Sequence, residues 1–320
     1  MSRGNSNEAK GINLPVIFLA GTTASGKTEL ALKLAEEFPI DLVSVDSGQV
    51  YRGMDIGTAK PPRDVLERAP HALIDIRNVE SPYSAADFQK DARLSISQSR
   101  SRGRIPLCVG GTLFYFSALL HGLSKLPRAD AALRASLEEE AKSIGWDGLY
   151  ERLRKLTPER SERIEPHDRQ RILRALEIYE LGGEFGAATE RTGGLIDANV
   201  PVLKLCLFTS DRAVLHERIS RRFERMLEQG FVEEVQGLRA AFPNAQETPA
   251  MRSVGYQQAW YYLDGRISRQ EFEEDVQTAT RRLAKRQLTW LRNDPGWIWF
   301  DALNPGAMNA VSRFLASMDC

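Results

Sequence analysis

The sequence predicts an α/β fold in which helices flank a parallel sheet and a helical insertion interrupts the sheet-forming part of the chain. Short apolar segments alternate with helical patterns before residue 127 and again after residue 199, which is typical of strands joined by right-handed crossovers. Between residues 127 and 199 the pattern is charged and helical, with no convincing strand. We therefore expect a core domain of residues 1–126 and 200–320 and a helical insertion domain of residues 127–199.

The composition is that of a globular protein without a dominant charge. The chain has 320 residues, of which 42% are hydrophobic and 27% charged, so it can bury a substantial core. Its formal net charge is zero, so any nucleic acid must be bound by local basic patches. The three cysteines and four histidines have no metal-ligand or redox spacing. The first 13 residues lack the apolar segment of a signal peptide, and no apolar run approaches the ~20 residues that cross a bilayer. We expect a cytoplasmic protein with no membrane partner.

Six strands are expected in the core. The segments that predict them are Val16–Ala20, Asp41–Ser47, His71–Ile76, Ile105–Thr112, Val202–Phe208 and Trp297–Phe300. Helical patterns follow residue 28, begin near Ser84 and follow Thr112, and the longest covers residues 268–291. A terminal helix is expected after the last strand.

The residues after the first strand match the phosphate-binding sequence G-x-x-x-x-G-K-[ST] in full. They are Gly21, Thr22, Thr23, Ala24, Ser25, Gly26, Lys27 and Thr28. The strand before the motif and the helix after it supply the context that the motif requires. Glycines let backbone N–H groups turn toward phosphate oxygens, and the helix N-terminus adds partial positive charge. We therefore expect a P-loop NTPase-like fold that binds a diphosphate or triphosphate, with Lys27 on a terminal phosphate and Thr28 on Mg²⁺.

Polar residues end two further strands at the same edge of the predicted sheet. Asp46 and Ser47 end the second strand, and Gly110, Gly111 and Thr112 end the fourth. Ligands of open α/β sheets bind at the carboxyl ends of the strands. A carboxylate placed there can bind Mg²⁺ or act as a general base.

Three basic clusters could bind phosphates. Residues 151–174 contain eight Lys or Arg against five Asp or Glu, with Arg171 and Arg174 on one helical face. Residues 281–292 contain no acidic residue, and they place Trp290 beside Lys285 and Arg286. Arginines also recur between residues 218 and 225, where Arg222 is expected to neutralise a departing phosphate group. For the first two clusters, a solvated helix face is the alternative interpretation.

Taken together, these segments resemble the tRNA dimethylallyltransferase family, whose members prenylate N6 of an adenosine beside the anticodon. The matching segments run in order through nearly the whole chain: Gly21–Thr28, Ser44–Tyr51, Gly53–Pro61, Tyr83–Phe88, Gly103–Thr112, Gln170–Glu177, Val254–Gln257 and Leu283–Arg292. The phosphate loop is shared with many ATPases. The segments Met54–Pro61 and Lys285–Arg292 are far more specific.

The resemblance implies a transfer reaction. The phosphate loop would bind the diphosphate of dimethylallyl diphosphate, and Asp46 would act as general base on the N6 amine of adenosine 37. Thr23 would touch the diphosphate or its leaving oxygen, and Lys27 and Arg222 would stabilise the leaving group with Mg²⁺. Stabilising the charge on the departing diphosphate would accelerate the reaction most, because the allylic carbon gains cationic character as diphosphate leaves. The target base must leave the anticodon-loop stack to reach this site.

The resemblance also implies which residues contact the anticodon stem-loop. Those carried over from the family, together with the basic pair on the long helix, are Asp46, Ser47, Gly48, Gln49, Thr112, Arg134, Gln170, Arg171, Ile172, Leu173, Arg174, Arg252, Ser253, Val254, Gly255, Tyr256, Gln257, Lys285 and Arg286. No obligatory protein partner is expected, and a monomer is the default.

Three other functions share parts of this pattern. A small-molecule kinase would use the same loop to transfer the γ-phosphoryl group of ATP. An adenylate prenyltransferase would modify free AMP, ADP or ATP, and would not need the basic insertion. A non-catalytic RNA-binding protein could use a nucleotide as a switch, although an intact Asp46 and phosphate loop argue against it.

Overall fold

The computed structural model describes residues 14–127, 129–182 and 191–317. The polar N-terminal segment, on which the cytoplasmic expectation partly depends, lies outside these residues. The chain divides into two compact units: unit 1 comprises Met1–Leu120 and Leu195–Cys320, and unit 2 comprises His121–Gly194. Both boundaries lie a few residues before those expected from the sequence.

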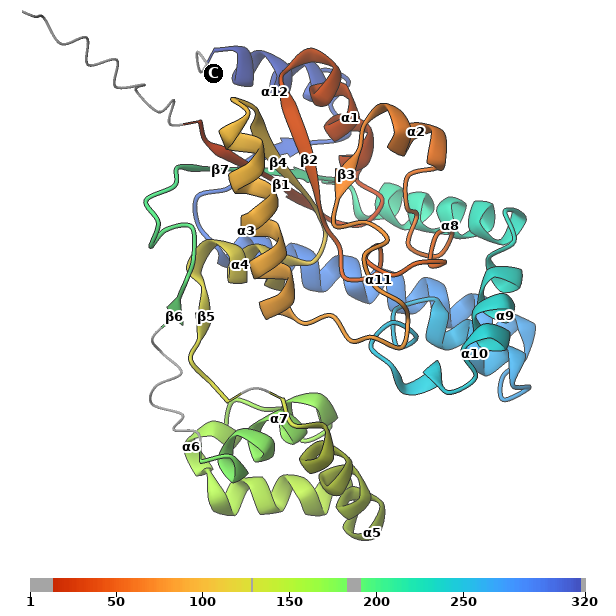
Figure 1. The fold of residues 1–320 in the computed structure, drawn as a ribbon. Coiled ribbons are helices and arrows are strands. Elements are labelled where there is room, and N and C mark those ends of the chain that lie inside the picture. The colour runs from red at the N-terminus through yellow and green to blue at the C-terminus, as the bar shows by residue number, and fades with distance from the viewer. Residues whose placement is uncertain (1–13, 128, 183–190, 318–320) are drawn as a thin grey trace, which may run out of the picture. The chain divides into compact units, whose positions relative to one another are not determined.

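Unit 1 is built on the expected parallel sheet, and its strand order is β3-β2-β4-β1-β7-β8 (Figure 1). In that order, the strands are His71–Ala72, Ile40–Val45, Ile105–Gly110, Val16–Gly21, Val202–Phe208 and Ile298–Asp301. All five pairings are parallel. The predicted α/β class, a parallel sheet flanked by helices, is therefore confirmed.

The helices of unit 1 surround this sheet. They are α1 (Lys27–Glu37), α2 (Arg63–Arg68), α3 (Ala85–Ser101), α4 (Leu113–His121), α8 (Arg212–Glu228), α9 (Phe231–Ala241), α10 (Tyr256–Leu263), α11 (Arg269–Asn293) and α12 (Ala307–Ala316), with a 3₁₀ turn at Ala245–Glu247. Helices α3 and α11 begin with capping boxes, Ser84 with Asp87 and Ser268 with Glu271.

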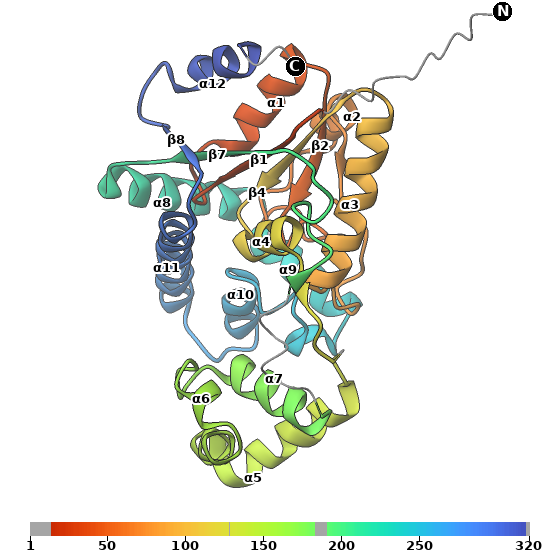
Figure 2. The same ribbon diagram turned by 90° about the vertical axis from the view of Figure 1, so that its left-hand side faces the viewer.

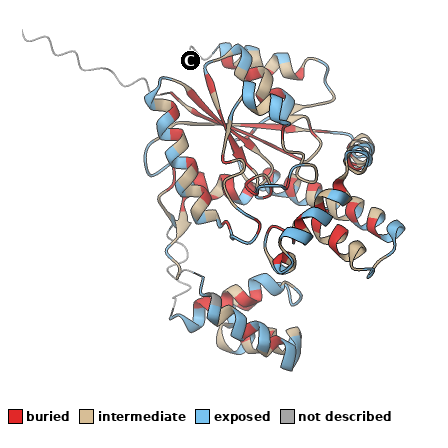
Figure 3. Ribbon diagram, turned by 45° about the vertical axis from the view of Figure 1, so that its right-hand side comes forward, coloured by how far each residue is buried: buried red, intermediate tan, exposed pale blue. Residues whose placement is uncertain are grey.

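Alternate residues of each central strand supply two separate cores. In β1, Ile17 and Leu19 pack with α1 and α12, whereas Phe18 and Ala20 pack with α3 and α4. A strand buried on both faces has to be apolar at every position, which explains the continuous apolar runs of the sequence. Figure 2 shows α1 and α12 together on one face of the sheet, and Figure 3 shows buried residues concentrated on its strands.

Two details differ from the expectation. The strand expected over residues 71–76 ends after Ala72, because Leu73 and Asp75 take left-handed backbone conformations with φ of 69° and 55°. The insertion also contains a short strand, β6 (Arg191–Thr192), which pairs with β5 (Leu123–Ser124) in an antiparallel ladder. Two residues are too few to leave a periodic pattern in a sequence.

Unit 2 is otherwise helical, as expected. Its helices are α5 (Ala131–Leu156), α6 (Pro158–Ser161) and α7 (Arg169–Glu180), and α5 is kinked at Gly145, where φ is 77°. A core of its own lies between α5 and α7 and includes Leu149, Leu153, Ile172 and Leu176. Just outside unit 2, the N–H of Leu195 donates to the carbonyl of Leu119, and the N–H of Ile196 to that of Leu120, at 2.9 and 3.2 Å. Among the described residues, no helix is both long and apolar enough to cross a membrane.

Candidate active site

The phosphate loop lies between β1 and α1, as the motif requires. Gly26, the residue before α1, has a φ of 92°, and Ala24 has a φ of 60°. These left-handed positions fold the loop back over the start of the helix. No side chain caps α1, so the first N–H groups of the helix remain available to an anion. The hydroxyl of Ser25 donates to the carbonyl of Thr22 at 2.8 Å and so stabilises the conformation of the loop.

Lys27 lies folded against this loop. Its Nζ atom donates to the carbonyl of Thr22 at 2.5 Å and to Oγ of Ser25 at 3.5 Å. Removal of the ammonium group from water, reinforced by the charge of Arg222, lowers the pKa of Lys27 to about 8, while the charge of Asp46 acts in the opposite direction. Lys27 therefore stands in a cationic environment that a bound anion would relieve.

Arg222 reaches the same loop from α8. Its Nη1 atom donates to Oγ1 of Thr23 at 3.3 Å. Desolvation lowers the pKa of Arg222, and the charge of Asp46 raises it. Because a guanidinium can only donate, Thr23 accepts this bond, and its own hydroxyl proton is left to point at another acceptor.

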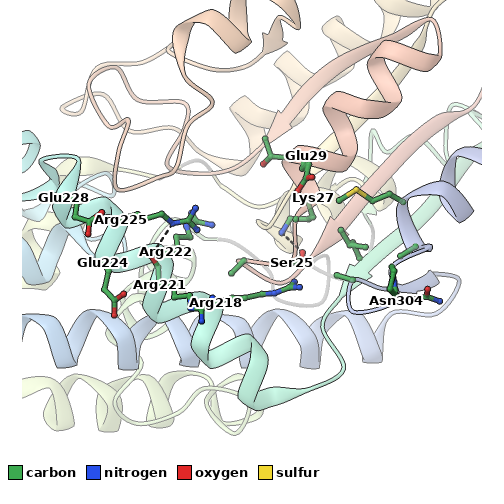
Figure 4. Close-up of a pocket in the computed structure, with 18 residues that line it drawn as sticks. Ser25, Lys27, Glu29, Arg218, Arg221, Arg222, Glu224, Arg225, Glu228 and Asn304 are labelled. Carbon is green, nitrogen blue, oxygen red and sulfur yellow. Dashed lines mark hydrogen bonds between the residues drawn. The ribbon is translucent and has the colours of Figure 1, made fainter.

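A cleft of about 930 Å³ opens beside the loop. Figure 4 shows that the phosphate loop, α8 and the turn after β8 enclose it. Four of its lining residues are arginines of α8: Arg218, Arg221, Arg222 and Arg225. The exposed Thr28 also lines the cleft. Successive arginines lie three, one and three residues apart, so together they span about two turns of α8. Glu224 and Glu228 line the same cleft, so the positive charge is partly balanced.

Asp46 follows β2 directly, at the edge where the sequence places it. Its Oδ1 atom accepts hydrogen bonds from the N–H groups of Gly48 and Gln49 at 2.8 and 3.2 Å. Within the described part of the chain, its second carboxylate oxygen has no hydrogen-bond partner. One oxygen thus fixes the side chain through the turn, and the other is free to remove a proton from a bound substrate.

The end of β4 meets the end of β2. Oγ1 of Thr112 accepts from the N–H of Ser47 at 3.0 Å, and the N–H of Thr112 donates to the carbonyl of Val45 at 3.2 Å. Gly110 has to be glycine, because a Cβ atom there would lie 2.0 Å from the carbonyl oxygen of Val45. The structure thus joins Thr112 to the Asp46 turn.

Gln287 of α11 connects the two halves of this site, and the sequence did not single it out. This buried side chain accepts from the N–H of Thr23 at 2.9 Å and donates to the carbonyl of Gly111 at 2.9 Å. Its only signal in the sequence is its position in the segment Lys285–Arg292. A glutamine on an otherwise amphipathic helix gives no indication of partners so distant in the chain.

The loop Met54–Pro61 is held from α9 by Glu234, which sequence reasoning also missed. Its carboxylate accepts from three consecutive N–H groups, those of Asp55, Ile56 and Gly57, at 2.9, 2.7 and 3.2 Å. It also accepts from the hydroxyl of Tyr256 at 2.6 Å. A Cβ atom at Gly57 would lie 2.3 Å from the ring of Phe231, so only glycine fits beneath this carboxylate.

The predicted RNA-contacting segments mix exposed and buried residues. In 170–174, Gln170 and Arg171 are exposed, whereas Ile172 and Leu173 belong to the core of unit 2. In 252–257, Arg252 is exposed, whereas Gly255 and Tyr256 are buried. Ser253, Val254 and Gln257 are partly exposed. Side-chain contacts with a partner can come only from the accessible members of each segment.

Two predicted RNA-binding arginines of unit 2 share one buried carboxylate. Glu177 is fully buried, and its Oε2 atom accepts from Arg134 at 3.0 Å and from Arg174 at 2.7 Å. Its Oε1 atom accepts from the N–H of Asp130 at 2.7 Å, and Arg174 also donates to the carbonyl of Pro127 at 2.6 Å. Desolvation opposes ionisation here, but the hydrogen bond from Arg174 leads the interactions that hold the pKa of Glu177 below its usual range. Arg134 and Arg174 are therefore fixed in place rather than solvated freely.

The basic face of α11 differs from that of α7. Arg282, Lys285, Arg286 and Arg292 are all exposed, and none has a carboxylate partner within the described part of the chain. Arg281, in contrast, turns inward and donates to Ser220 and Gln277. The exposed cations recur at the spacing of one helical face, so they form an unneutralised basic surface.

Comparison with known proteins identifies the relatives of this chain. A family model described as IPP transferase matches residues 49–294. The chain is 53% identical to a tRNA dimethylallyltransferase of Thiobacillus denitrificans, over 95% of this chain and 96% of that protein. It is 49% identical to one of Alkalilimnicola ehrlichii, over 94% and 96%.

Solved structures give the same relationship. A full-length tRNA isopentenylpyrophosphate transferase of Bacillus halodurans superimposes with a TM-score of 0.68 at 34% identity, covering 95% of this chain and 96% of the other. A eukaryotic dimethylallyltransferase, captured acting on tRNA, superimposes with a TM-score of 0.73 at 27% identity, covering 96% and 79%. The chain belongs to the IPP transferase family.

Proposed function

We propose that this protein transfers the dimethylallyl group of dimethylallyl diphosphate to N6 of adenosine 37 in tRNA. The observation that carries the proposal is the chain of hydrogen bonds that joins the Asp46 turn to the phosphate loop: Thr112 accepts from the N–H of Ser47, and Gln287 bridges Gly111 and Thr23. A candidate general base is thus linked through the end of β4 to the loop that carries Lys27, a cation suited to a diphosphate leaving group. The names of the family relatives support the same reaction.

The donor diphosphate would bind in front of the phosphate loop. The N–H groups at the start of α1, the ammonium of Lys27 and the arginines of α8 provide donors for its oxygens. Thr23 accepts from Arg222, so its own proton is free to reach the oxygen that leaves the allyl group. Negative charge grows on that oxygen as the bond breaks, so fixed donors there stabilise the transition state more than the ground state.

Mg²⁺ fits this donor site. The exposed hydroxyl of Thr28 lines the cleft, and a magnesium ion bound to a diphosphate needs few protein ligands because phosphate oxygens and water complete its shell. No cluster of three acidic, histidine or cysteine side chains suited to a metal occurs in the described ranges. When bound, the ion would neutralise charge on the diphosphate.

Asp46 would remove the proton. The N6 nitrogen forms a bond to C1 of the allyl group while the bond between C1 and the diphosphate oxygen breaks. The N6 proton passes to the free oxygen of Asp46, and diphosphate departs. An aromatic exocyclic amine is a weak nucleophile, so a positioned carboxylate accelerates this step.

Basic side chains of each unit would bind the acceptor tRNA. In unit 1 these are Arg252, Lys285 and Arg286, and in unit 2 they are Arg134, Arg171 and Arg174. Their contacts with the anticodon stem-loop would supply affinity that the zero net charge cannot. Ser47, Gly48, Gln49 and Thr112 surround Asp46 and would contact the target base itself.

One assay tests the reaction. Purified protein is incubated with dimethylallyl diphosphate labelled in the allyl group, together with unmodified tRNA or with AMP. Label in tRNA at the target adenosine is the expected result. Label in AMP would instead identify an adenylate prenyltransferase, and phosphorylation of a small acceptor by ATP at about 1 s⁻¹ or faster would identify a kinase.

A further inference from the structure

Two large aromatic side chains lie exposed beside the acceptor edge of the site. Phe114 of α4 and Trp290 of α11 retain 49% and 41% of their accessible surface. Their ring centroids are 6.4 Å apart, with an interplanar angle of 69°. An edge-to-face pair leaves ring faces that neither partner covers. The pair therefore presents uncovered aromatic surface to solvent, on which a flat ligand can stack.

The pair stands close to the acceptor-binding residues on both helices. Phe114 follows Thr112, whose hydroxyl accepts from Ser47, by two positions. Trp290 lies one helical turn beyond Gln287, which contacts Gly111 and Thr23. Helix α4 buries nearly all its other apolar residues, including Leu113, Tyr115 and Phe116, so the exposure of Phe114 is not a general property of the helix.

The surroundings of the pair favour a nucleic acid. Arg286 precedes Trp290 by four residues, one turn of α11, so the two side chains lie on the same side of the helix. Arg286 is exposed and lacks a carboxylate partner in the described part of the chain. Aromatic faces next to unneutralised cations are the combination that binds single-stranded nucleic acid, with rings stacking on bases and cations on phosphates.

We propose that Phe114 and Trp290 form an aromatic platform on which an unpaired RNA base next to the target adenosine stacks. The inference rests on the proposed function, because it takes the acceptor to be RNA. A target nucleotide that leaves the loop stack exposes the faces of its two neighbours. The platform would replace the lost stacking on one of them and would hold the loop open while the target lies beside Asp46.

The test combines a protein change with an RNA change. Stem-loops carrying an abasic nucleotide on the 5′ or the 3′ side of the target adenosine are compared with the intact stem-loop. For one of these positions, we expect the wild-type protein to lose about 5- to 100-fold in affinity. Trp290→Leu should bind the intact stem-loop as weakly as the wild-type protein binds the abasic one. Removal of the base should then reduce the affinity of Trp290→Leu little further. Trp290→Phe keeps a stacking face and should retain most of the affinity.

Three controls make the result specific. Trp299, which is 36% exposed and packs edge-on against Phe208, offers a matched substitution, and Trp299→Leu should leave RNA affinity unchanged. The salt dependence of log Kd should keep its slope in Trp290→Leu, because stacking releases no counterions. If thermal unfolding shows that Trp290→Leu is destabilised, Phe114→Leu tests the platform from the other helix.

The outcomes separate the platform from the proposed function. Two results would overturn the platform even while prenyl transfer proceeds. One is an equal loss of RNA affinity on base removal in the wild-type protein and in Trp290→Leu. The other is wild-type RNA affinity in both Trp290→Leu and Phe114→Leu. Absence of any transfer to the intact stem-loop by the wild-type protein would instead overturn the proposed function, whatever the binding results.

Discussion

Gln287 on α11 and Thr23 in the phosphate loop, 264 positions apart in the chain, share a hydrogen bond of 2.9 Å. The same glutamine donates to Gly111 at the end of β4. The helix that carries the exposed cations Lys285 and Arg286 is therefore joined through its opposite face to the donor loop. The buried side chain of Gln287 thus links the helix proposed to bind RNA to the loop proposed to bind diphosphate.

Replacing Gln287 by methionine should loosen this junction. Methionine has a similar length but forms neither hydrogen bond, so it leaves the N–H of Thr23 and the carbonyl of Gly111 unsatisfied. We expect the free energy of unfolding to fall by about 1–3 kcal/mol and donor affinity to decrease. Urea unfolding and calorimetric titration with dimethylallyl diphosphate measure the two effects. Gln270→Met, an exposed change on the same helix, is the matched control. Unchanged donor affinity in Gln287→Met would show that the junction does not serve the loop.

Asp46→Asn should separate chemistry from structure. The amide oxygen can still accept from the N–H groups of Gly48 and Gln49, so the turn and the affinity for tRNA should persist within a few-fold. The chemical step should slow by about 10²–10⁴ because the proton acceptor is lost. Single-turnover transfer under saturating tRNA and donor checks this. Asp41→Asn, in the strand that precedes Asp46 but ion-paired to Arg102 and Arg104, should change stability and not the rate. A near-normal rate in Asp46→Asn would assign the base elsewhere.

Donor binding should depend on pH through Lys27. Its pKa in the donor-free protein is about 8, so its positive charge is present below pH 8 and is lost as the pH rises through that value. Affinity for dimethylallyl diphosphate should therefore decline above pH 8, and binding near that pH should take up a proton. Calorimetry in buffers of different ionisation enthalpy measures the uptake. Lys27→Arg, whose guanidinium stays charged, should abolish the dependence. A flat affinity between pH 7 and 9.5 in wild-type protein would contradict it.

The same shift makes an opposite prediction for stability. The unfolded chain holds the Lys27 proton up to about pH 10.5, whereas the folded protein releases it near pH 8. Between these values the unfolded state binds more protons, so this group makes unfolding less favourable as the pH rises. Comparing urea unfolding of wild-type protein and Lys27→Met at pH 7.5 and 9.5 isolates the contribution. The difference between the two proteins should shift in favour of the wild type at the higher pH.

The two arginines of α7 should respond differently to removal. Arg171 is exposed, and among the residues that the structure describes it pairs only with Asp168, at 3.3 Å, so Arg171→Ala should change the free energy of unfolding by no more than about 0.5 kcal/mol. Arg174→Ala removes a hydrogen bond from the buried Glu177 and should cost about 1.5–3 kcal/mol. If each binds a phosphate, either change should flatten the salt dependence of tRNA affinity by about 0.7–0.9 per contact. Unchanged affinity at every salt concentration would make this helix face an ordinary solvated surface.

Local patterns in the sequence predicted the strand, loop and helix around the phosphate motif. The motif spans eight consecutive residues, so most of its backbone conformation is set locally. The position of Asp46 followed from the rule that parallel strands end at one edge. Gln287, Glu234 and Glu177 could not be found in this way. Their partners Thr23, Asp55 and Arg134 are brought to them by packing, and a polar residue on a helix has the same pattern whether it faces water or a distant loop.

The chain leaves unit 1 at the end of α4 and returns to unit 1 beside the same helix. Leu119 and Leu195 are hydrogen-bonded neighbours, as are Leu120 and Ile196, although the whole of residues 121–194 lies between them in the chain. A short turn could join these ends, because they already lie together. The two units also have separate cores, so a chain shortened in this way would keep the phosphate loop and Asp46 and would lose only the basic side chains that unit 2 contributes.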